Sequence, residues 1–534
     1  MALTPLQEGM LFHYLEDPAG EYYFEQLSLE ISGAVGISLF EEAWNFVVAA
    51  NRMLRTVFRW EKTGSPTQIV LKDHRVRFEY YDLCAGAGGL ESTGERLEAV
   101  KKADRDEKFD LQEVPFRITL CRVAQNRHEM ILSSHHILFD GWSTGIILTD
   151  FFNAYKDLCA GEVPVKPVRT SFKEYIRQSQ IQDSQMQEAY WKNYLEGVGP
   201  DDCTELPVKR RYTASRQNQN IAHSSAKHGF RIPFDRRTEY MENRITPAVL
   251  VYGAWGILLQ RYVNRGDVIF GTSVSGRSLP VEGIEDVVGL FINTVPLRFN
   301  AGISGQSCSL EDILVDLSRS LRAREAYEAT PLVKIHQYCG CGAGVELFDS
   351  LVVVENYPLD IRRIGEGGPL DPVSYSMVES THYDLTVVVR LTESIDVEFL
   401  YREEVFEGAM IRQLGTHFTR IVRGIVENPG QELRGFEFLS PEERRRILED
   451  FNNTGVEYPR DITLLSMFEQ QTERTGDRIA VVGKTSITYR ELDEKSGRIA
   501  RVLRDKGVGQ GDIAAVQMER SVEMVVVIFT ERSI

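Results

Sequence analysis

Helical and strand periodicities alternate along most of this chain, and the alternation restricts its possible folds to layered α/β arrangements. A helix is expected to begin near Thr4, whose hydroxyl can cap it, with Pro5 and Gln7 in favourable positions after it. Further on, apolar residues recur at strand or helical spacing in five segments: strand 27–31, helix 40–57, strands 116–121 and 129–135, and helix 143–155.

A similar alternation returns in the second half of the chain. It predicts, in this order, helix 249–263, strands 268–274, 290–297, 349–355, 383–391 and 395–401, and helix 405–426. We therefore expect two similar α/β halves, although no strong sequence repeat relates one half to the other.

Changes in composition suggest where these units end. Pro164 and Pro167 mark a crossover between the halves, and the character of the chain changes after Phe438 to a charged helix and a polar linker. A new α/β unit then follows, with helix 464–474, strands 479–482 and 486–489, helix 491–506, strand 513–517 and the start of another helix. The predicted boundaries are 1–165 and 166–435 for the two halves, 436–461 for the linker and 462–534 for the last unit.

Overall composition excludes several classes of protein. The 534 residues are too many for one hydrophobic core, and the net charge of −17 disfavours nucleic-acid binding. Seven scattered cysteines without a CxxC pair predict neither a zinc site nor a disulfide framework, and Cys339 and Cys341 are more typical of loop thiols than of metal ligands. The N-terminus is unlike a signal peptide and the apolar run 524–529 is too short to span a bilayer, so we expect a cytoplasmic protein without membrane contact.

Two adjacent histidines, His135 and His136, stand at the end of a predicted strand, directly before a turn. Successive side chains of a strand point to opposite faces, so the two rings cannot easily share one metal ion. One ring is expected to face the interior and the other a cavity. Because histidine titrates near neutral pH, the second ring is a candidate for proton transfer. The alternative is a pair of hydrogen-bonded core histidines beside a turn.

Asp140 and Gly141 follow the histidine pair. Asp140 can cap the next helix, form a buried ion pair with an arginine, or turn the loop. Gly141 permits close backbone approach or a positive φ, and it places an N–H at a helix start, where negative charge is favoured.

The segment from His135 to Gly141 resembles the HHxxxDG signature of the condensation domains of nonribosomal peptide synthetases, which belong to the chloramphenicol-acetyltransferase-like superfamily. Other stretches resemble further motifs of these domains in the same order: LTPLQEGMLFH (3–13), ANRMLRTVF (50–58), DVIFGTSVSGR (267–277), VGLFINTVPLR (288–298) and LFDSLVVVENYP (347–358). The second of these departs from the family, because Ala50 and Asn51 stand where arginine and histidine are usual.

This resemblance implies two chloramphenicol-acetyltransferase-like subdomains in a V-shaped pseudo-dimer, with the active site in a channel between them. Beyond them, the segments DRIA (477–480), TYREL (488–492) and ERS (519–521) resemble the start of an adenylation domain. No phosphate loop of that family is present, so we expect a C-terminal α/β fragment without adenylation activity.

The resemblance also implies an activity and its partners. A donor and an acceptor peptidyl carrier protein, together with adjoining synthetase domains, would present substrates on phosphopantetheine arms. The acceptor amine would attack the donor thioester in antibiotic or other secondary-metabolite biosynthesis, with no cofactor or metal belonging to the enzyme itself.

Roles follow by position in the family motifs. His136 is the expected working residue, as a base or by orienting the amine; His135 and Gly141 would support it, and Asp140 would pair with Arg277. Arg55 is a second candidate for structural support of the site, and the candidates for lining the channel are Trp142, Ser143 and Asn293.

Three alternatives stay open within this resemblance. The opening segment and Trp142 are more similar to domains that receive a D-configured donor residue than to the common type that joins L-residues. A second possibility is an acyltransferase acting on substrates that no carrier holds, and a third is a non-catalytic platform that recruits other enzymes to a carrier.

Overall fold

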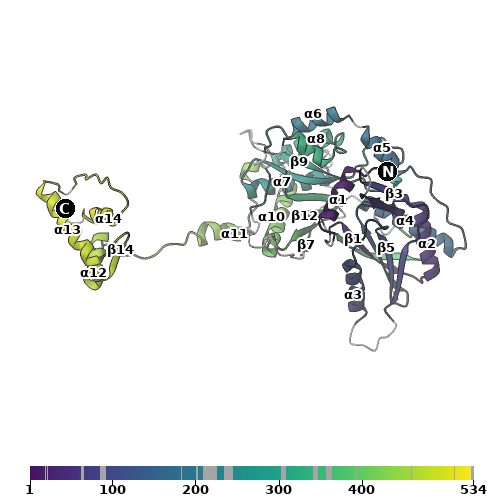
Figure 1. The fold of residues 1–534 in the computed structure, drawn as a ribbon, viewed down its shortest axis with the longest axis horizontal. Coiled ribbons are helices and arrows are strands. Elements are labelled where there is room, and N and C mark those ends of the chain that lie inside the picture. The colour runs from purple at the N-terminus through teal and green to yellow at the C-terminus, as the bar shows by residue number, and fades with distance from the viewer. Residues whose placement is uncertain are drawn as a thin grey trace. The chain divides into compact units, whose positions relative to one another are not determined.

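The computed structural model describes the whole chain apart from residues 19, 21, 62–64, 85–91, 182, 200–202, 208–224, 234–244, 302–307, 341–346, 356–363, 380, 392–393, 459, 510 and 531–534. Cys341, half of the cysteine pair noted above, lies outside the described residues. The chain divides into two compact units, residues 1–439 and 440–534, and each is considered by itself (Figure 1).

The first sheet of unit 1–439 has the strand order β11-β1-β6-β5-β4. Its N-terminal strands are β1 (Phe24–Ser32), β4 (Arg77–Asp82), β5 (Phe116–Ala124) and β6 (Arg127–His135), and β4–β5 is its one parallel pair within the described residues. The predicted strands 27–31, 116–121 and 129–135 are confirmed. Helix α1 (Pro5–Glu16) has the predicted capping box of Thr4 and Gln7.

Two helices, α2 (Ile37–Ala50) and α4 (Gly141–Cys159), pack against this sheet, because their apolar faces and those of β1, β5 and β6 form one buried cluster (Figure 1). Trp44 of α2 stacks on Phe151 of α4 with ring centroids 4.6 Å apart. Burying aromatic surface of this size is among the larger stabilising contributions in a core. The helix that follows the histidine pair is thereby held firmly against the sheet.

One predicted helix is shorter than expected. The helix predicted over 40–57 ends at Ala50, where Asn51 adopts an extended backbone and its side-chain amide donates to the carbonyl of Val47. A short 3₁₀ turn, η1 (Arg52–Arg55), leads into strand β2 (Thr56–Arg59), which pairs with β3 (Thr67–Val70). The β-branched Thr56 and Val57 favour this strand, and helical spacing alone concealed it.

The second sheet has the order β7-β13-β12-β10-β8-β9. Its strands are β7 (Ser225–Pro233), β8 (Asp267–Val274), β9 (Asn293–Asn300), β10 (Ser350–Glu355), β12 (Leu385–Leu391) and β13 (Ser394–Arg402), and it packs with α7 (Pro247–Val263), α8 (Leu310–Glu325) and α10 (Gly408–Glu427) around a second buried cluster (Figure 1). The predicted second-half strands are present, with β9 beginning later than expected. The sequence reading missed β7, α8 and the shorter α3 (Thr93–Asp106), α5 (Phe172–Gln180), α6 (Ser184–Tyr194) and α9 (Leu332–Tyr338).

Strand β11 (Asp371–Glu379) connects the two sheets and was not predicted. It lies in sequence between β10 and β12 of the second sheet, but it pairs antiparallel with β1 of the first. In this register Glu379 lies opposite Glu25. The second half of the chain thus completes a sheet of the first half. The predicted domain boundaries stay predictions.

Unit 440–534 contains α11 (Pro441–Arg445), one turn of π-helix (Arg446–Asp450), α12 (Leu464–Thr475), the hairpin β14 (Ile479–Val482) and β15 (Ser486–Thr488), α13 (Tyr489–Asp505) and α14 (Val522–Ile528). Its small core gathers Phe468, Ile487, Leu492, Val522 and Val526. The strand predicted over 513–517 is wrong. Ile513 is 98% exposed, and no described strand pairs with this segment, so its backbone forms no hydrogen bonds with a neighbouring strand.

Over the described residues, no helix combines the length and the hydropathy needed to cross a bilayer.

Gly276 lies directly before Arg277 in the connection from β8 to β9, and substituting it tests how tightly this connection packs. Its φ is +65°, and a Cβ there would lie 1.8 Å from the carbonyl oxygen of Phe291. Gly276→Ala is therefore expected to lower the melting temperature in calorimetry far more than Gly161→Ala. Gly161 has a φ of +75° but open space around it, so its substitution carries only the left-handed backbone penalty of about 1–2 kcal/mol. Equal decreases for the two variants would contradict this packing.

Candidate active site

The histidine pair lies where β6 ends. The backbone N–H of His136 donates to the carbonyl of Tyr23 at 2.8 Å, and its Nδ1 lies 2.8 Å from the carbonyl oxygen of Phe139. His135 is 4% exposed, whereas the side chain of His136 is 19% exposed and lines a cavity. The strand therefore directs the two rings into different surroundings.

His135 is a neutral, buried ring. Its Nδ1 accepts the backbone N–H of Ile137 at 3.1 Å, so the proton of the ring is on Nε2. Burial, and to a smaller extent the neighbouring His136, lower the pKa of His135 to about 3. With this pKa the ring does not take up a proton near neutral pH, and its contacts make it part of the support of the turn.

Asp140 is fully buried and is bonded on both carboxylate oxygens. It caps α4, since Oδ1 accepts the backbone N–H of Ser143 at 2.9 Å and its hydroxyl at 2.8 Å. Its Oδ2 accepts the N–H of Phe291 at 3.0 Å, and its own N–H donates to the carbonyl of Gly289. Two of the possibilities left open by the sequence, helix capping and a buried ion pair, are thus realised together, because Arg277 also reaches Oδ1 at 3.2 Å.

Arg277 fills the other side of this network. Its side chain is 5% exposed, and it donates to the carbonyls of Ile284 and Val287 as well as to Asp140. The guanidinium lies 3.9 Å from the ring centroid of Phe291, a cation–π contact. Burial lowers the pKa of Arg277, and the neighbouring Asp140 opposes this effect.

A cavity of about 540 Å³ extends from His136 between residues of the two sheets. Helix α1, strands β1, β9, β10 and β11, and helix α9 all contribute to its wall. The polar or titratable side chains in it are those of His13, Tyr23, Glu25, His136, Ser273, Asn293, Thr294, His336, Gln337, Glu379, Thr381, His382 and Tyr383. Apolar side chains such as Met10 and Leu332 line the rest, as is usual for ligand pockets.

Some of the remaining predicted site residues line this cavity, and others lie away from it. Asn293 lines the cavity and donates to the carbonyls of Glu328 and Thr330, both at 2.8 Å. Gly141 also lines it, but it begins α4 without the positive φ that the sequence left possible.

Trp142 and Ser143 are not cavity-lining residues, contrary to expectation. Because α4 begins at Gly141, the helix turns both side chains toward the Arg277 network. Trp142 donates to the carbonyl of Glu285 at 2.8 Å and lies 5.5 Å from the guanidinium, and Ser143 bonds Asp140.

Arg55 lies away from the cavity. It binds the backbone carbonyls of Leu71 and Lys72 next to β3, and no contact joins it to His136 or Asp140. At the position where the family usually has histidine, the Asn51 amide donates to Asp150, which also pairs with Arg169. Both residues stabilise the first half at a distance from the histidine turn.

Several residues of the site were not found from the sequence. Gln7, noted only for capping α1, donates to the carbonyl of Ile137 at 2.9 Å and so fixes the histidine turn. Tyr23 has a φ of +63°, uncommon for a residue with a side chain, and its hydroxyl lies 2.9 Å from Nδ1 of His382. For Glu25 the sequence offered only a weak signal, a carboxylate near the start of strand β1.

Three carboxylates meet between the sheets. Glu25 lies on β1, Glu379 opposite it on β11, and Glu355 on β10. Burial is the main cause that raises the pKa of each, to about 8 for Glu379, and the carboxylates reinforce one another. Arg390 pairs with Glu355 at 2.6 Å and partly offsets the negative charge.

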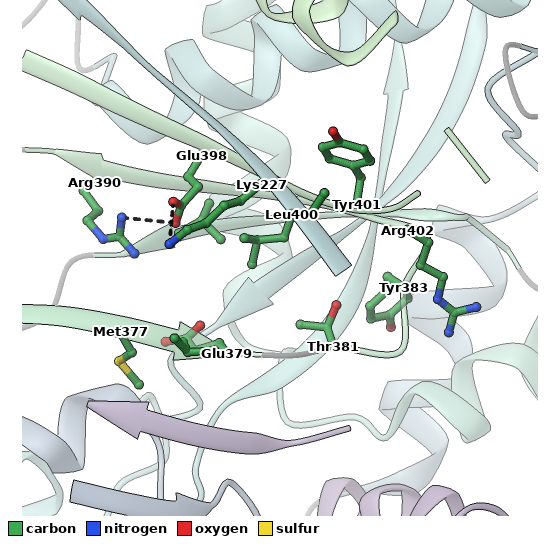
Figure 2. A pocket seen from close by; sticks show the side chains of 13 residues that line it. Lys227, Met377, Glu379, Thr381, Tyr383, Arg390, Glu398, Leu400, Tyr401 and Arg402 are labelled. Carbon is green, nitrogen blue, oxygen red and sulfur yellow. Dashed lines mark ion pairs between the residues drawn. The ribbon is translucent and has the colours of Figure 1, made fainter. Parts of the chain in front are cut away.

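A smaller cavity of about 190 Å³ adjoins the first, and Glu379, Thr381 and Tyr383 line both. Figure 2 shows Glu398 between Lys227 and Arg390 on one side of it, at 3.5 and 3.7 Å, and Glu379 on the facing strand. The cations of this cavity are therefore paired.

In the part of the chain that the structure describes, no three His, Cys, Asp or Glu side chains are grouped to hold a metal ion.

Comparisons with known proteins agree with this architecture. A family model described as "Condensation domain" matches residues 1–448, and one described as "AMP-binding enzyme" matches residues 468–530. Surfactin synthase subunit 2 of Bacillus subtilis (strain 168) is 32% identical over 534 residues. This alignment covers 98% of the chain but only 14% of the relative, so the chain spans about one seventh of that protein's length.

Solved structures show the same fold. The starter condensation domain of rhizomide synthetase RzmA matches with a TM-score of 0.68 at 19% identity, over 82% of this chain and 99% of that one. A second match is AB3403, a four domain nonribosomal peptide synthetase, with a TM-score of 0.70 at 18% identity, over 96% of this chain and 39% of that one.

The chain therefore belongs to the condensation-domain family, and its mixed α/β fold is the chloramphenicol-acetyltransferase-like fold of that family. A short segment similar to AMP-binding enzymes follows. The relatives of the whole chain include nonribosomal peptide synthetases.

Removing Arg277 should leave the charge of Asp140 buried without its partner. Arg277→Ala is expected to lower the free energy of unfolding by about 3–5 kcal/mol, whereas His136→Ala should have a much smaller effect. Arg319→Ala is the matched control, because Arg319 pairs with Asp316 on the surface, both 73% exposed, and such pairs contribute less than about 1 kcal/mol. Denaturant unfolding measures all three, and an Arg277→Ala variant as stable as the control would contradict a structural role for the pair.

Proposed function

We propose that this chain forms a peptide bond between two substrates that carrier proteins deliver on phosphopantetheine arms. The observation that carries the proposal is His136, which lines a cavity large enough for a substrate and whose backbone N–H, ring Nδ1 and following residue are each held by a hydrogen bond. Membership of the condensation-domain family supports the reaction class.

The step is a nucleophilic substitution at a thioester. The α-amine of the acceptor attacks the thioester carbonyl carbon of the donor, so that a C–N bond forms and the C–S bond breaks. The proton lost by the amine goes to Nε2 of His136, which returns it to the departing thiolate of the donor arm. Histidine suits both transfers because its pKa lies near neutrality.

Positioning contributes beside the proton transfer. The apolar walls of the cavity can exclude water from the thioester, while its polar groups near His136 can orient the amine. Holding two tethered reactants in attack geometry can provide as much acceleration as the base, or more. Asp140, Arg277 and Gln7 act by fixing the turn that carries His136, and not by contact with substrate.

The partners follow from this reaction. A donor and an acceptor carrier protein bring the substrates, and adjoining synthetase domains load them; the arms belong to the carriers, and this unit supplies no cofactor of its own. We also propose a cytoplasmic location and a D-configured donor residue, the latter because the opening segment and Trp142 resemble domains with that preference.

The test is peptide formation from chemically loaded donor and acceptor carriers, followed by mass spectrometry. His136→Ala is expected to slow product formation by roughly 10²- to 10⁴-fold, because the proton acceptor is lost. His74→Ala, which removes a partly buried histidine that does not line the cavity, should leave the rate unchanged.

The donor configuration and the substrate form are tested in the same assay. A D-loaded donor should react faster than its L-counterpart, and substrates without a carrier should react poorly. Full product from His136→Ala would reject the assigned role of this residue, and carrier binding without any condensation would favour a recruitment platform.

A further inference from the structure

The imidazole of His136 has two hydrogen-bond acceptors beside the same nitrogen. Nδ1 lies 2.8 Å from the carbonyl oxygen of Phe139 and 3.2 Å from Oε1 of Glu25. A carbonyl oxygen only accepts hydrogen bonds, so Nδ1 must carry a proton. In the neutral ring, Nε2 on the opposite edge then keeps its lone pair.

Glu25 is well placed to act on this ring. It is 5% exposed, it comes from β1 while His136 follows β6, and the two strands pair directly. Phe24 of β1 lies opposite His135, which sets the carboxylate beside the turn that carries His136. The contact is therefore built by the sheet register and does not depend on a loose surface side chain.

Other charged groups surround the pair from every neighbouring element. Asp140 in the turn, Glu355 on β10 and Glu379 on β11 are acidic, Arg390 on β12 is basic, and His135 is neutral. Burial raises the pKa of Glu25 well above its usual range, and Asp140 and Glu355 raise it further, while Ser134 opposes them through a hydrogen bond.

We propose that Glu25 is a positioning residue for the condensation reaction: it holds the Nδ1–H of His136 together with the Phe139 carbonyl, and its carboxylate balances the charge of the imidazolium when Nε2 takes the amine proton. The proposal rests on the proposed function, since it assigns a proton to Nε2 during the reaction. Neither the signature around His136 nor the comparisons assign Glu25 a role.

The physical reason is the low dielectric of the site. An imidazolium formed in a buried cavity without a counter-charge is unfavourable, and an opposite charge within about 4 Å shifts a pKa by roughly 1–3 units toward the charged form. The reverse also holds, because a proton on His136 favours the ionised form of Glu25.

The sign of the pH dependence follows from this pairing. Only the ionised carboxylate can balance an imidazolium, and its pKa is raised, so Glu25 loses its proton over a range above that of an ordinary carboxyl. The kcat of the unaltered chain should rise with pH through that range. In Glu25→Gln the amide can still accept the Nδ1–H but carries no charge, so the part of the rise that comes from Glu25 should be absent and only the dependence due to the His136 base should remain.

The kinetic experiment compares the unaltered chain, Glu25→Gln and Glu129→Gln with loaded carriers over pH. Glu129 is a carboxylate of the same sheet, paired with Lys101 and outside the cavity wall, so its variant should keep the normal kcat and pH profile. Glu25→Gln is expected to lose tenfold or more in kcat, with KM for the acceptor carrier changed less than twofold. Unchanged kcat and pH profile in Glu25→Gln would overturn the proposal.

A second measurement does not depend on turnover. ¹⁵N-histidine NMR of the unaltered chain, with His136→Gln used to assign the signal, should show the Nδ1–H tautomer in the neutral ring. In Glu25→Gln the pKa of the His136 ring should fall by about one unit or more. A neutral ring protonated on Nε2, or a pKa unchanged in the variant, would overturn the role of Glu25. If the unaltered chain makes no peptide, the proposed reaction fails, while the NMR result still decides whether the pair exists.

Discussion

The buried carboxylate of Asp140 holds the site together. It receives four hydrogen bonds, two from Ser143 in its own helix and two from Phe291 and Arg277 in the connection between β8 and β9. One charge therefore caps α4 and joins this helix to a segment more than a hundred residues away. Since a buried charge is stable only when its partners are complete, this network fixes the turn before α4 and, with it, the position of His136.

The same turn is held from two further directions. Gln7 of α1 binds the carbonyl of Ile137, and the Tyr23 carbonyl in front of β1 binds the N–H of His136. Such support allows the ring to stay partly exposed at a cavity while its orientation is fixed. The crossing strand β11 adds Glu379 opposite Glu25, so that the second half of the chain contributes charge around the ring. Tertiary pairing, and not local sequence, creates this electrostatic environment.

The sequence predicted the local elements of the site well. Strands β5 and β6 were predicted as adjacent strands and the doubled histidine marked the strand end. Asp140 was placed as a helix cap and, through the family resemblance, as the ion-pair partner of Arg277, as the structure shows. These features depend on neighbouring residues or on a motif with fixed spacing. The start of the short strand β2 was mistaken for helix, because four residues of mixed periodicity fit both patterns.

Features that depend on long-range pairing could not be predicted. Strand β11 mixes polar and apolar residues and is exposed on both faces, so nothing in its composition indicates that it leaves its own half to pair with β1. Trp142 and Ser143 are adjacent to the motif, but the helix turns them toward Arg277 and away from the cavity. Glu25 gave only a weak signal, because it is one of two carboxylates in strand β1, and its meaning depends on a partner more than a hundred residues away.

The proposed reaction requires that an acceptor amine meets Nε2 of His136 inside the cavity. A structure of the chain bound to an acceptor carrier with a non-hydrolysable aminoacyl arm tests this most directly. The account predicts the amine nitrogen within about 3 Å of Nε2, with Nδ1 still bonded to Phe139 and Glu25. An arm that ends elsewhere, or a ring whose Nε2 is already occupied by a protein group, would contradict it.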